Sequence, residues 1–387
     1  MKMKKNNLLI LAVAALGFAA CSSDETTAVN EKLAESNAIS FRANVNGVMR
    51  ATYTPGVITG TTFSDNDQIN VWATKGTSPA SFFNNATFTY NTSNGFTSNP
   101  VYYWPATVDA STNKLDFYAS YGADQTAAGV VTGFTPSTSG THYDLLTANL
   151  GVTSKPSAGA AAGSLAFKHA LSQIEVKVKN TNANLEFVVS GVKIGYVAMD
   201  GTCTFTSGSP VWSAVTVPTS ASTNIYSQTI SNQEVSSSTP AALTGVTNWM
   251  IVPQDLTLST GIRAYSKAYS SATTGTASAD PVLNCAYIAI EMIIRNATDD
   301  GPIVAKQWCY WPITTNLLAG RKYTYIVDLA GGGYQPCNTR TGDANTDLVP
   351  VLENLGIWFS NASSIEVWVT DLNGDSNTTN DDIDVAM

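Results

Sequence analysis

The chain has 387 residues, of which 20 are basic and 29 are acidic, so its formal net charge is −9. This balance excludes a nucleic-acid-binding role, because no basic patch is available to neutralise phosphates. Charged residues make up only 13% of the chain, while Ser, Thr, Asn, Gly and Tyr are frequent, a composition typical of short strands joined by polar turns. A chain of this length is expected to form about two domains.

Residues 1–20 are predicted to be a signal peptide. Three lysines precede a mostly apolar run at residues 8–20, which is too short to span a bilayer as a helix. Cys21 directly follows two alanines, and this arrangement is similar to a lipoprotein signal, in which the cysteine becomes the lipidated first residue. A plain secretory peptide with an incidental cysteine is the alternative. We therefore expect an outer-membrane lipoprotein at the cell surface, with residues 21–37 as a polar tether.

Residues 38–182 are predicted to form an N-terminal β-sandwich domain. Short strand-like segments alternate with polar turns, at residues 38–45, 68–73, 86–90, 101–104, 115–120 and 170–179. The last segment alternates cleanly, with Ile174, Val176 and Val178 on one face and charged residues on the other. This period of two places one face of a strand on a core and the other in water. The Gly/Ala/Ser-rich residues 153–164 are predicted to be a loop.

Residues 183–340 are predicted to form a C-terminal β-sandwich domain. Its strand-like segments are residues 185–189, 192–198, 203–206, 249–252, 262–265, 282–294, 306–311 and 323–329. The Ser/Thr/Ala-rich residues 207–245 and 267–280 are predicted to be long exposed connections with some edge strand. The expected fold class is therefore all-β, with two β-sandwich domains.

Residues 341–387 form an acidic tail without Lys or Arg, in which residues 355–359 and 364–369 are strand-like. Oxygen-bearing side chains alternate near its end, at Asp371, Asn373, Asp375 and Asn377, with Asp382 further on. This spacing is similar to that of a calcium-binding loop, although Ser376 stands where such a loop has Gly. A solvated tail without an ion is the alternative account.

No catalytic residue is assigned, and the protein is not expected to be an enzyme. Neither His142 nor His169 lies near a recognisable nucleophile motif. We expect His169 to be a hydrogen-bonded structural residue, and no cofactor apart from the calcium considered above. Cys285 and Cys309 lie in neighbouring strand-like segments and could face one another as a disulfide, with buried free thiols as the alternative.

Several local patterns follow one another in a defined order. They are a strand at residues 39–41 followed by Arg50-Ala51, then residues 63–69 (FSDNDQI), 101–105 (VYYWP), 115–119 (LDFYA), 167–172 (FKHALS), 250–254 (MIVPQ) and 319–325 (AGRKYTY). With this order and the lipoprotein-like start, residues 1–329 resemble the fimbrillin family, the lipoprotein-derived pilins of Bacteroides-type bacteria. Residues 330–387 share a less specific resemblance.

The resemblance implies two β-sandwich domains of transthyretin-like topology arranged end to end. It also implies a structural role, as a shaft or tip subunit of a surface fimbria, and a maturation step in which an Arg-specific protease removes the N-terminal strand. We expect the cut between Arg50 and Ala51. Arg42 is the competing site, but it lies inside the first predicted strand.

The resemblance further implies that a strand of another subunit fills the groove left by the removed strand. The expected donor strand lies in the tail, with Ile365, Val367 and Val369 on its apolar face. The alternative is that this strand belongs to the second domain of its own subunit. Expected partners are other copies of the chain or related pilin subunits, the outer membrane through the lipid on Cys21, and a ligand on a host or bacterial surface.

Two rival functions remain open at the level of sequence. One is a surface lipoprotein that binds glycans or other ligands, with aromatic side chains as stacking platforms. The other is an anchor subunit of the fimbria that keeps its lipid. The N-terminal residue of the protein recovered from cells distinguishes both from an assembled pilin.

Overall fold

The computed structural model describes residues 37–45, 63–75, 80–105, 114–138, 143–156, 160–206, 208–215, 225–256, 286–298, 302–313, 315–336, 348–350 and 364–367. Its elements are the strands β1–β23 and a short 3-10 helix, η2 (Leu329–Gly331), so the all-β prediction is confirmed. No helix in these ranges is long and apolar enough to cross a membrane.

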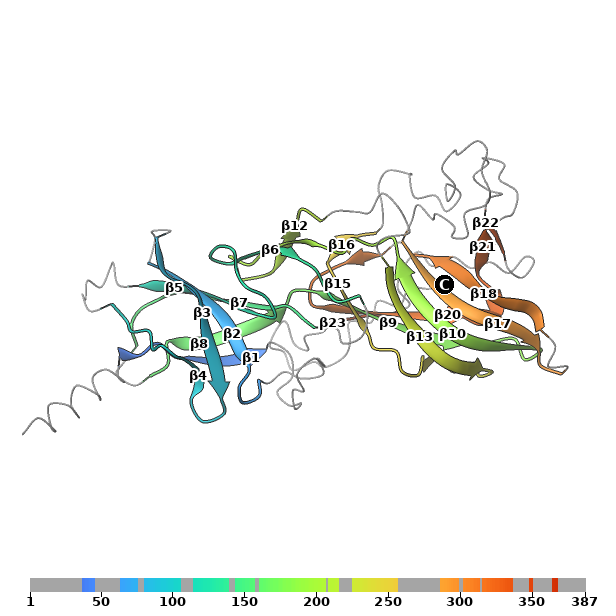
Figure 1. The fold of residues 1–387 in the computed structure, drawn as a ribbon, viewed down its shortest axis with the longest axis horizontal. Coiled ribbons are helices and arrows are strands. Elements are labelled where there is room, and N and C mark those ends of the chain that lie inside the picture. Colours follow the sequence, from blue (N-terminus) through green and yellow to red (C-terminus); the bar gives the residue numbers. More distant parts are fainter. Residues whose placement is uncertain are drawn as a thin grey trace, which may run out of the picture.

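Seven strands of the first half form a sheet that closes into a barrel at one end of the elongated molecule (Figure 1). In sheet order they are β1 (Phe41–Val45), β4 (Gly95–Ser98), β3 (Ser81–Asn91), β2 (Gln68–Lys75), β5 (Leu115–Tyr121), β7 (Leu146–Thr153) and β8 (Gly163–His169). The pair that closes it, β1 with β8, is parallel. The closed barrel differs from the expected N-terminal sandwich, because β1 pairs with both β4 and β8, which would be the exposed edges of an open sheet.

The barrel core is largely aromatic. Strand alternation turns one phenylalanine or more from most of its strands inward, including Phe41, Phe88, Phe96, Phe117 and Phe167, all fully buried. Edge-to-face aromatic pairs of this kind contribute about 0.5–1.5 kcal/mol each beyond the burial of their area. The core therefore depends on the exact fit of a few large rings.

A hydrogen-bonded turn at residues 64–67 precedes β2. The Asp67 carboxylate accepts a hydrogen bond from the Ser64 N–H at 2.7 Å, and the Asp67 N–H donates to the Ser64 carbonyl at 3.0 Å. Asn66 has a φ of 75°, a left-handed conformation that Asn tolerates better than most residues. The pattern at residues 63–69 thus serves to build this turn.

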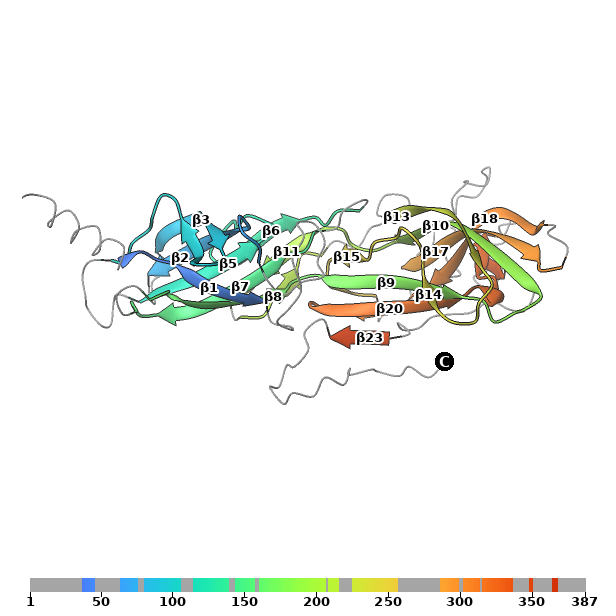
Figure 2. The same cartoon turned by 90° about the horizontal axis from the view of Figure 1, so that it is seen from below.

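Two sheets pack face to face in the second half, as two layers in Figure 2. One has the order β13 (Ile225–Val235), β10 (Leu185–Gly195), β17 (Tyr287–Asn296), β18 (Pro302–Pro312), β21 (Tyr334–Pro336) and β22 (Leu348–Pro350). The other has the order β14 (Ala241–Ala242), β9 (Ser172–Lys179), β20 (Arg321–Asp328) and β23 (Ser364–Val367), with β15 (Trp249–Ile251) also paired to β9. Residues of both sheets, such as Phe187 and Tyr325, share one buried core.

A small sheet joins strands from both halves of the chain. It has the order β12 (Val211–Ser213), β11 (Gly201–Thr204) and β6 (Val130–Phe134), and a third apolar cluster that includes Leu171 and Met250 lies beside it. A further pair consists of β16 (Gln254–Asp255) and β19 (Asn316–Leu317). The chain leaves the barrel at residues 170–171, since β9 pairs with β20 and β15. The expected domain boundary at residues 182/183 therefore does not coincide with the place where the chain leaves the barrel.

Some predicted strand segments differ from the observed strands. Segment 185–189 and residues 192–195 of the next segment belong to the single strand β10, because a bulge between Val189 and Gly191 lets the strand continue. Segment 101–104 contributes only a bridge between Tyr103 and Ala38. The expected connection 207–245 includes β12, β13 and β14, and β4, β6, β7 and β8 had no predicted counterpart. Segments 262–265 and 355–359 lie outside the described residues.

The suggested disulfide between Cys285 and Cys309 is wrong, because Cys309 is a free cysteine. Cys309 on β18 lies opposite Ile290 on β17, and Cys309 and Cys203 are both free and buried. Burial raises the pKa of each of these two thiols to about 12, so neither is a reactive thiolate at neutral pH. Cys285 itself lies outside the described residues.

Candidate functional site

The first strand, β1, is held in the barrel by a large buried side chain. Phe41 is fully buried, and its ring centroid lies 5.2 Å from that of Phe88 and 5.0 Å from that of Phe117, both edge to face. Ile39, just before the strand, is also buried. Arg42 points the opposite way and is exposed. Residues 39–42 thus alternate, with Ile39 and Phe41 on the inner face and Arg42 on the outer face.

The backbone of β1 is bonded very unequally on its two sides. It pairs with β8 along its whole length, from Phe41 opposite Gly163 to Val45 opposite Phe167. Toward β4, the described residues form only the pair Phe41 and Phe96. Gly95 makes that approach possible, because a Cβ atom there would lie 2.4 Å from the Phe41 carbonyl oxygen.

The residues that precede β1 are bonded to two other segments. The Ile39 N–H donates to the Tyr102 carbonyl at 2.8 Å, and the Trp104 N–H donates to the Asn37 carbonyl at 3.0 Å. The Ala162 N–H donates to the Ser40 carbonyl at 2.7 Å. Without residues 37–45, these partners and one edge of β8 would lose their hydrogen bonds, and the Phe41 site would open to water.

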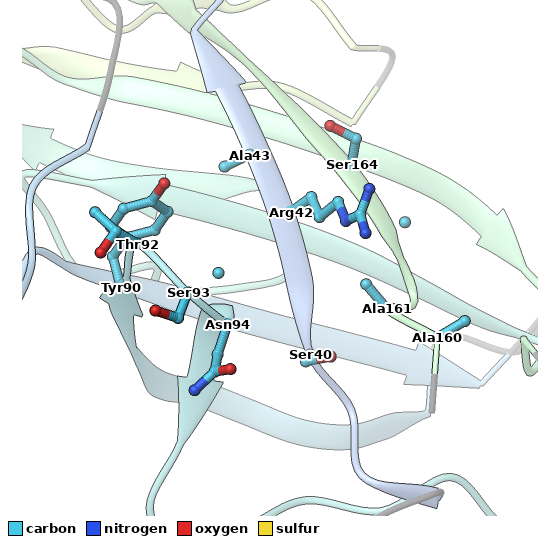
Figure 3. Close-up of a pocket in the computed structure, with 12 residues that line it drawn as sticks. Ser40, Arg42, Ala43, Tyr90, Thr92, Ser93, Asn94, Ala160, Ala161 and Ser164 are labelled. Carbon is cyan, nitrogen blue, oxygen red and sulfur yellow. The ribbon is translucent and has the colours of Figure 1, made fainter. Parts of the chain in front are cut away.

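An open cavity of about 860 Å³ lies over the outer face of β1 (Figure 3). Arg42 reaches from β1 toward Ser164 on β8, while Tyr90 and the turn at residues 92–94 lie on the other side of the strand. Small residues, among them Ala160 and Ala161, line the rest. The outer face of β1 is therefore accessible, whereas its inner face is covered by the barrel core.

Most other predicted site residues lie outside the described residues. They are Cys21, Arg50, Ala51, Val369 and the calcium candidates Asp371, Asn373, Asp375, Asn377 and Asp382. Within the described ranges, no group of three or more His, Cys, Asp or Glu side chains could hold a metal ion.

The tail segment at residues 364–367 forms β23 on the edge of β20 of the same chain (Figure 2). The strands are antiparallel, with Ile365 opposite Tyr323 and Val367 opposite Arg321. The strand-forming tendency of this segment is thus confirmed. Its pairing matches the geometry of the alternative in which the strand completes a sheet of its own subunit.

His169 in the FKHALS pattern is a structural residue. Its Nδ1 atom contacts the carboxylate of Asp144, and both side chains are buried. Burial raises the pKa of the Asp144 carboxyl, and the neighbouring His169 opposes only part of this rise. The Ala170 N–H also donates to the Leu145 carbonyl at 2.8 Å. The pair therefore fixes the end of β8 against the start of β7, and Asp144 is a partner that no sequence pattern indicated.

Two further patterns hold the second half together. The Gly320 N–H donates to the Leu171 carbonyl at 2.9 Å, which connects AGRKYTY to FKHALS. In MIVPQ, the buried Gln254 side chain accepts from the Ala198 N–H at 2.7 Å and donates to the Ala198 carbonyl at 3.1 Å. These patterns therefore have architectural roles in turns and strand contacts.

The chain is similar to one family of known proteins and to several solved structures. Residues 50–343 match the family described as fimbrillin-like. Among solved structures, a proposed cell adhesion protein of Bacteroides uniformis is 15% identical, with coverage of 76% of this chain and 95% of that protein and a TM-score of 0.42. A proposed cell adhesion protein of Parabacteroides distasonis is 9% identical, with coverage of 85% and 95% and a TM-score of 0.46. A fimbrial protein of Bacteroides ovatus is 16% identical, with coverage of 78% and 50% and a TM-score of 0.32.

No curated protein matches the chain. The family match nevertheless covers well over half of it and includes all the patterns from FSDNDQI to AGRKYTY. The chain belongs to the fimbrillin-like family.

Proposed function

We propose that this chain is a structural, non-enzymatic pilin subunit, in the shaft or at the tip of a surface fimbria. It is exported as an outer-membrane lipoprotein through Cys21, and its partners are other copies of itself or related pilin subunits. Its barrel and its β-sandwich correspond to the two domains that such a subunit carries end to end. Membership of the fimbrillin-like family supports this assignment.

The observation that carries the proposal is the position of β1. This strand comes early in the chain, closes the barrel, and is followed after residue 45 by the Arg50-Ala51 step. A cut between Arg50 and Ala51 would separate β1 covalently from the rest of the barrel. Arg42 is a poorer site, because it lies inside the strand opposite Ser164, and a protease would first have to unfold it.

Loss of β1 would create a strong binding site for another strand. The edge of β8 would present unpaired N–H and C=O groups, and the rings of Phe88 and Phe117 would become accessible at the vacated Phe41 site. Strand insertion that buries roughly 1,000–2,000 Å², at about 25 cal/mol per Å² of the apolar part, would make assembly nearly irreversible.

The donor strand of this proposal is the tail segment that contains Ile365, Val367 and Val369. Its alternation gives it one apolar face, as β1 has. In the free subunit it rests on β20, where only residues 364–367 are paired among the described residues. The competing role is a permanent edge strand in its own subunit.

The maturation step is tested by the N-terminal sequence of assembled fibres and by a pair of matched variants. We expect fibres to begin at Ala51, and Arg50→Ala to prevent assembly while Arg42→Ala permits it. Fibres that contain an intact residue 39–45 segment, or that form equally well with Arg50→Ala, would contradict the proposal. A lipidated Cys21 in the assembled fibre would indicate an anchor subunit instead.

The tail is tested by deletion of residues 354–387. The donor role predicts a folded, soluble subunit that can still be cleaved and no longer polymerises. Fibres formed by the deletion variant would count against donation. A subunit that fails to fold would favour the edge-strand role, since β20 would then need β23 for its own stability.

A further inference from the structure

A second cavity, of about 610 Å³, lies on the barrel away from the β1 strand. Its walls come from the turn at the start of β2 (residues 66–68), the end of β5 (residues 121–122), the end of β6 with the segment after it (residues 134–137), and Tyr143. None of its lining residues belongs to β1 or to the tail. Its size is within the usual range of small-ligand sites.

Aromatic side chains provide the apolar part of this cavity. Tyr143 is 56% exposed, and Tyr103, elsewhere on the barrel, is 44% exposed. Phe134 and Tyr121 are partly buried and line the same space. An exposed ring face is unfavourable in water, and it becomes favourable when it stacks on another apolar face.

Apart from the Asp67 carboxylate, the polar part of the cavity is neutral. The carboxamides of Asn66 and Gln68 and the hydroxyl of Thr135 belong to exposed residues and offer both donors and acceptors. The Asp67 carboxylate already accepts the Ser64 N–H and is buried. No described lining residue is Lys, Arg or His, so an anionic ligand would find no counter-charge.

The walls are held in place before any ligand arrives. The Asp67 bonds fix the turn that carries Asn66 and Gln68. Asp144, next to Tyr143 in the chain, is fixed by His169. Gly122 packs so tightly that a Cβ atom would lie 2.4 Å from the Asp144 carbonyl oxygen. A preformed site loses less conformational entropy on binding.

Aromatic faces beside neutral carboxamides and hydroxyls match one class of ligand. A sugar ring has an apolar C–H face that stacks on an aromatic ring and hydroxyl groups around its rim that require donors and acceptors. We propose that this cavity binds a neutral saccharide, which stacks on Tyr143 and hydrogen-bonds to Asn66 and Gln68. This activity is separate from strand exchange and does not depend on it.

The test is binding of the purified protein to an array that carries neutral, sialylated and sulfated oligosaccharides, followed by calorimetric titration of the strongest neutral binder. We expect Tyr143→Ala to weaken binding by about tenfold or more, since one stacking contact is lost. Tyr143→Phe should retain most of the affinity, because the ring face remains. Gln68→Ala should also weaken binding.

Tyr103→Ala is the matched control, because Tyr103 is an exposed tyrosine of the same barrel that does not line the cavity. It should leave affinity unchanged, and the thermal unfolding of all four variants should match that of the wild type. The proposal is overturned if no neutral saccharide binds, if only anionic glycans bind, or if Tyr143→Ala and Tyr103→Ala have the same effect.

Discussion

Replacement of Phe41 by Ala separates the role of β1 in the uncleaved subunit from its role in the fibre. The ring is fully buried and makes edge-to-face contacts with Phe88 and Phe117 at centroid distances of 5.2 and 5.0 Å. A buried Phe→Ala change costs about 3–5 kcal/mol of unfolding free energy, of which two aromatic pairs account for about 1–3 kcal/mol. Gly95 packs closely against the Phe41 carbonyl, so the backbone has little room to move into the space that the ring leaves empty. We therefore expect a loss in the upper part of the 3–5 kcal/mol range.

The assay is urea unfolding of the uncleaved subunit, followed by denaturant-induced dissociation of fibres assembled from the same variant. If β1 is removed at maturation, Phe41→Ala destabilises the uncleaved subunit but leaves the fibres as stable as wild-type fibres. Phe117→Ala is the matched control, because this equally buried ring stays in the barrel and its loss should weaken both states. Phe41→Leu keeps most of the volume and should fold even if Phe41→Ala does not.

Two results would refute this reasoning. An uncleaved Phe41→Ala subunit with wild-type stability would show that the ring does not hold β1 in the barrel. Fibres weakened by Phe41→Ala as much as by Phe117→Ala would show that β1 remains in the assembled subunit.

Two further predictions concern the stability of each half. Gly95→Ala should lower the melting temperature of the uncleaved subunit by more than Gly133→Ala does. Both glycines have positive φ angles, of 74° and 66°, but of the two only Gly95 would bring a Cβ atom into a clash, with the Phe41 carbonyl. Equal losses would contradict the close approach of Gly95 to Phe41. Burial raises the pKa of Glu175, but the Lys322 ammonium, with Nζ 2.9 Å from the carboxylate, acts together with Lys177 and Thr324 to outweigh burial, and the pKa lies below its ordinary value of 4.5. The resulting stability is present above pH 4.5 and is lost as the pH falls through the lowered value, so Glu175→Gln should reduce the melting temperature at neutral pH, and this reduction should shrink as the pH falls below 4.5. A difference that persists in acid would contradict this electrostatic role.

The local sequence determined many of the strands and the faces that they bury. In β9, Ile174, Val176 and Val178 are buried as their alternation predicts, while Glu175 and Lys177 lie on the opposite face. The turn at residues 64–67 and the inward position of Phe41 also follow from local patterns. Such patterns are readable because side-chain direction in a strand depends only on position along it.

Only the tertiary structure decided which strands meet. The parallel pairing of β1 with β8 closes the barrel, although the two strands lie more than a hundred residues apart in the chain. The pairing of β6 with β11 joins the two halves. The contact of His169 with Asp144 and the cavity beside Tyr143 likewise depend on segments distant in the chain. A strand's alternation specifies its faces but not its neighbour, since partner and register are selected by the closure of long loops and by the packing of the whole core.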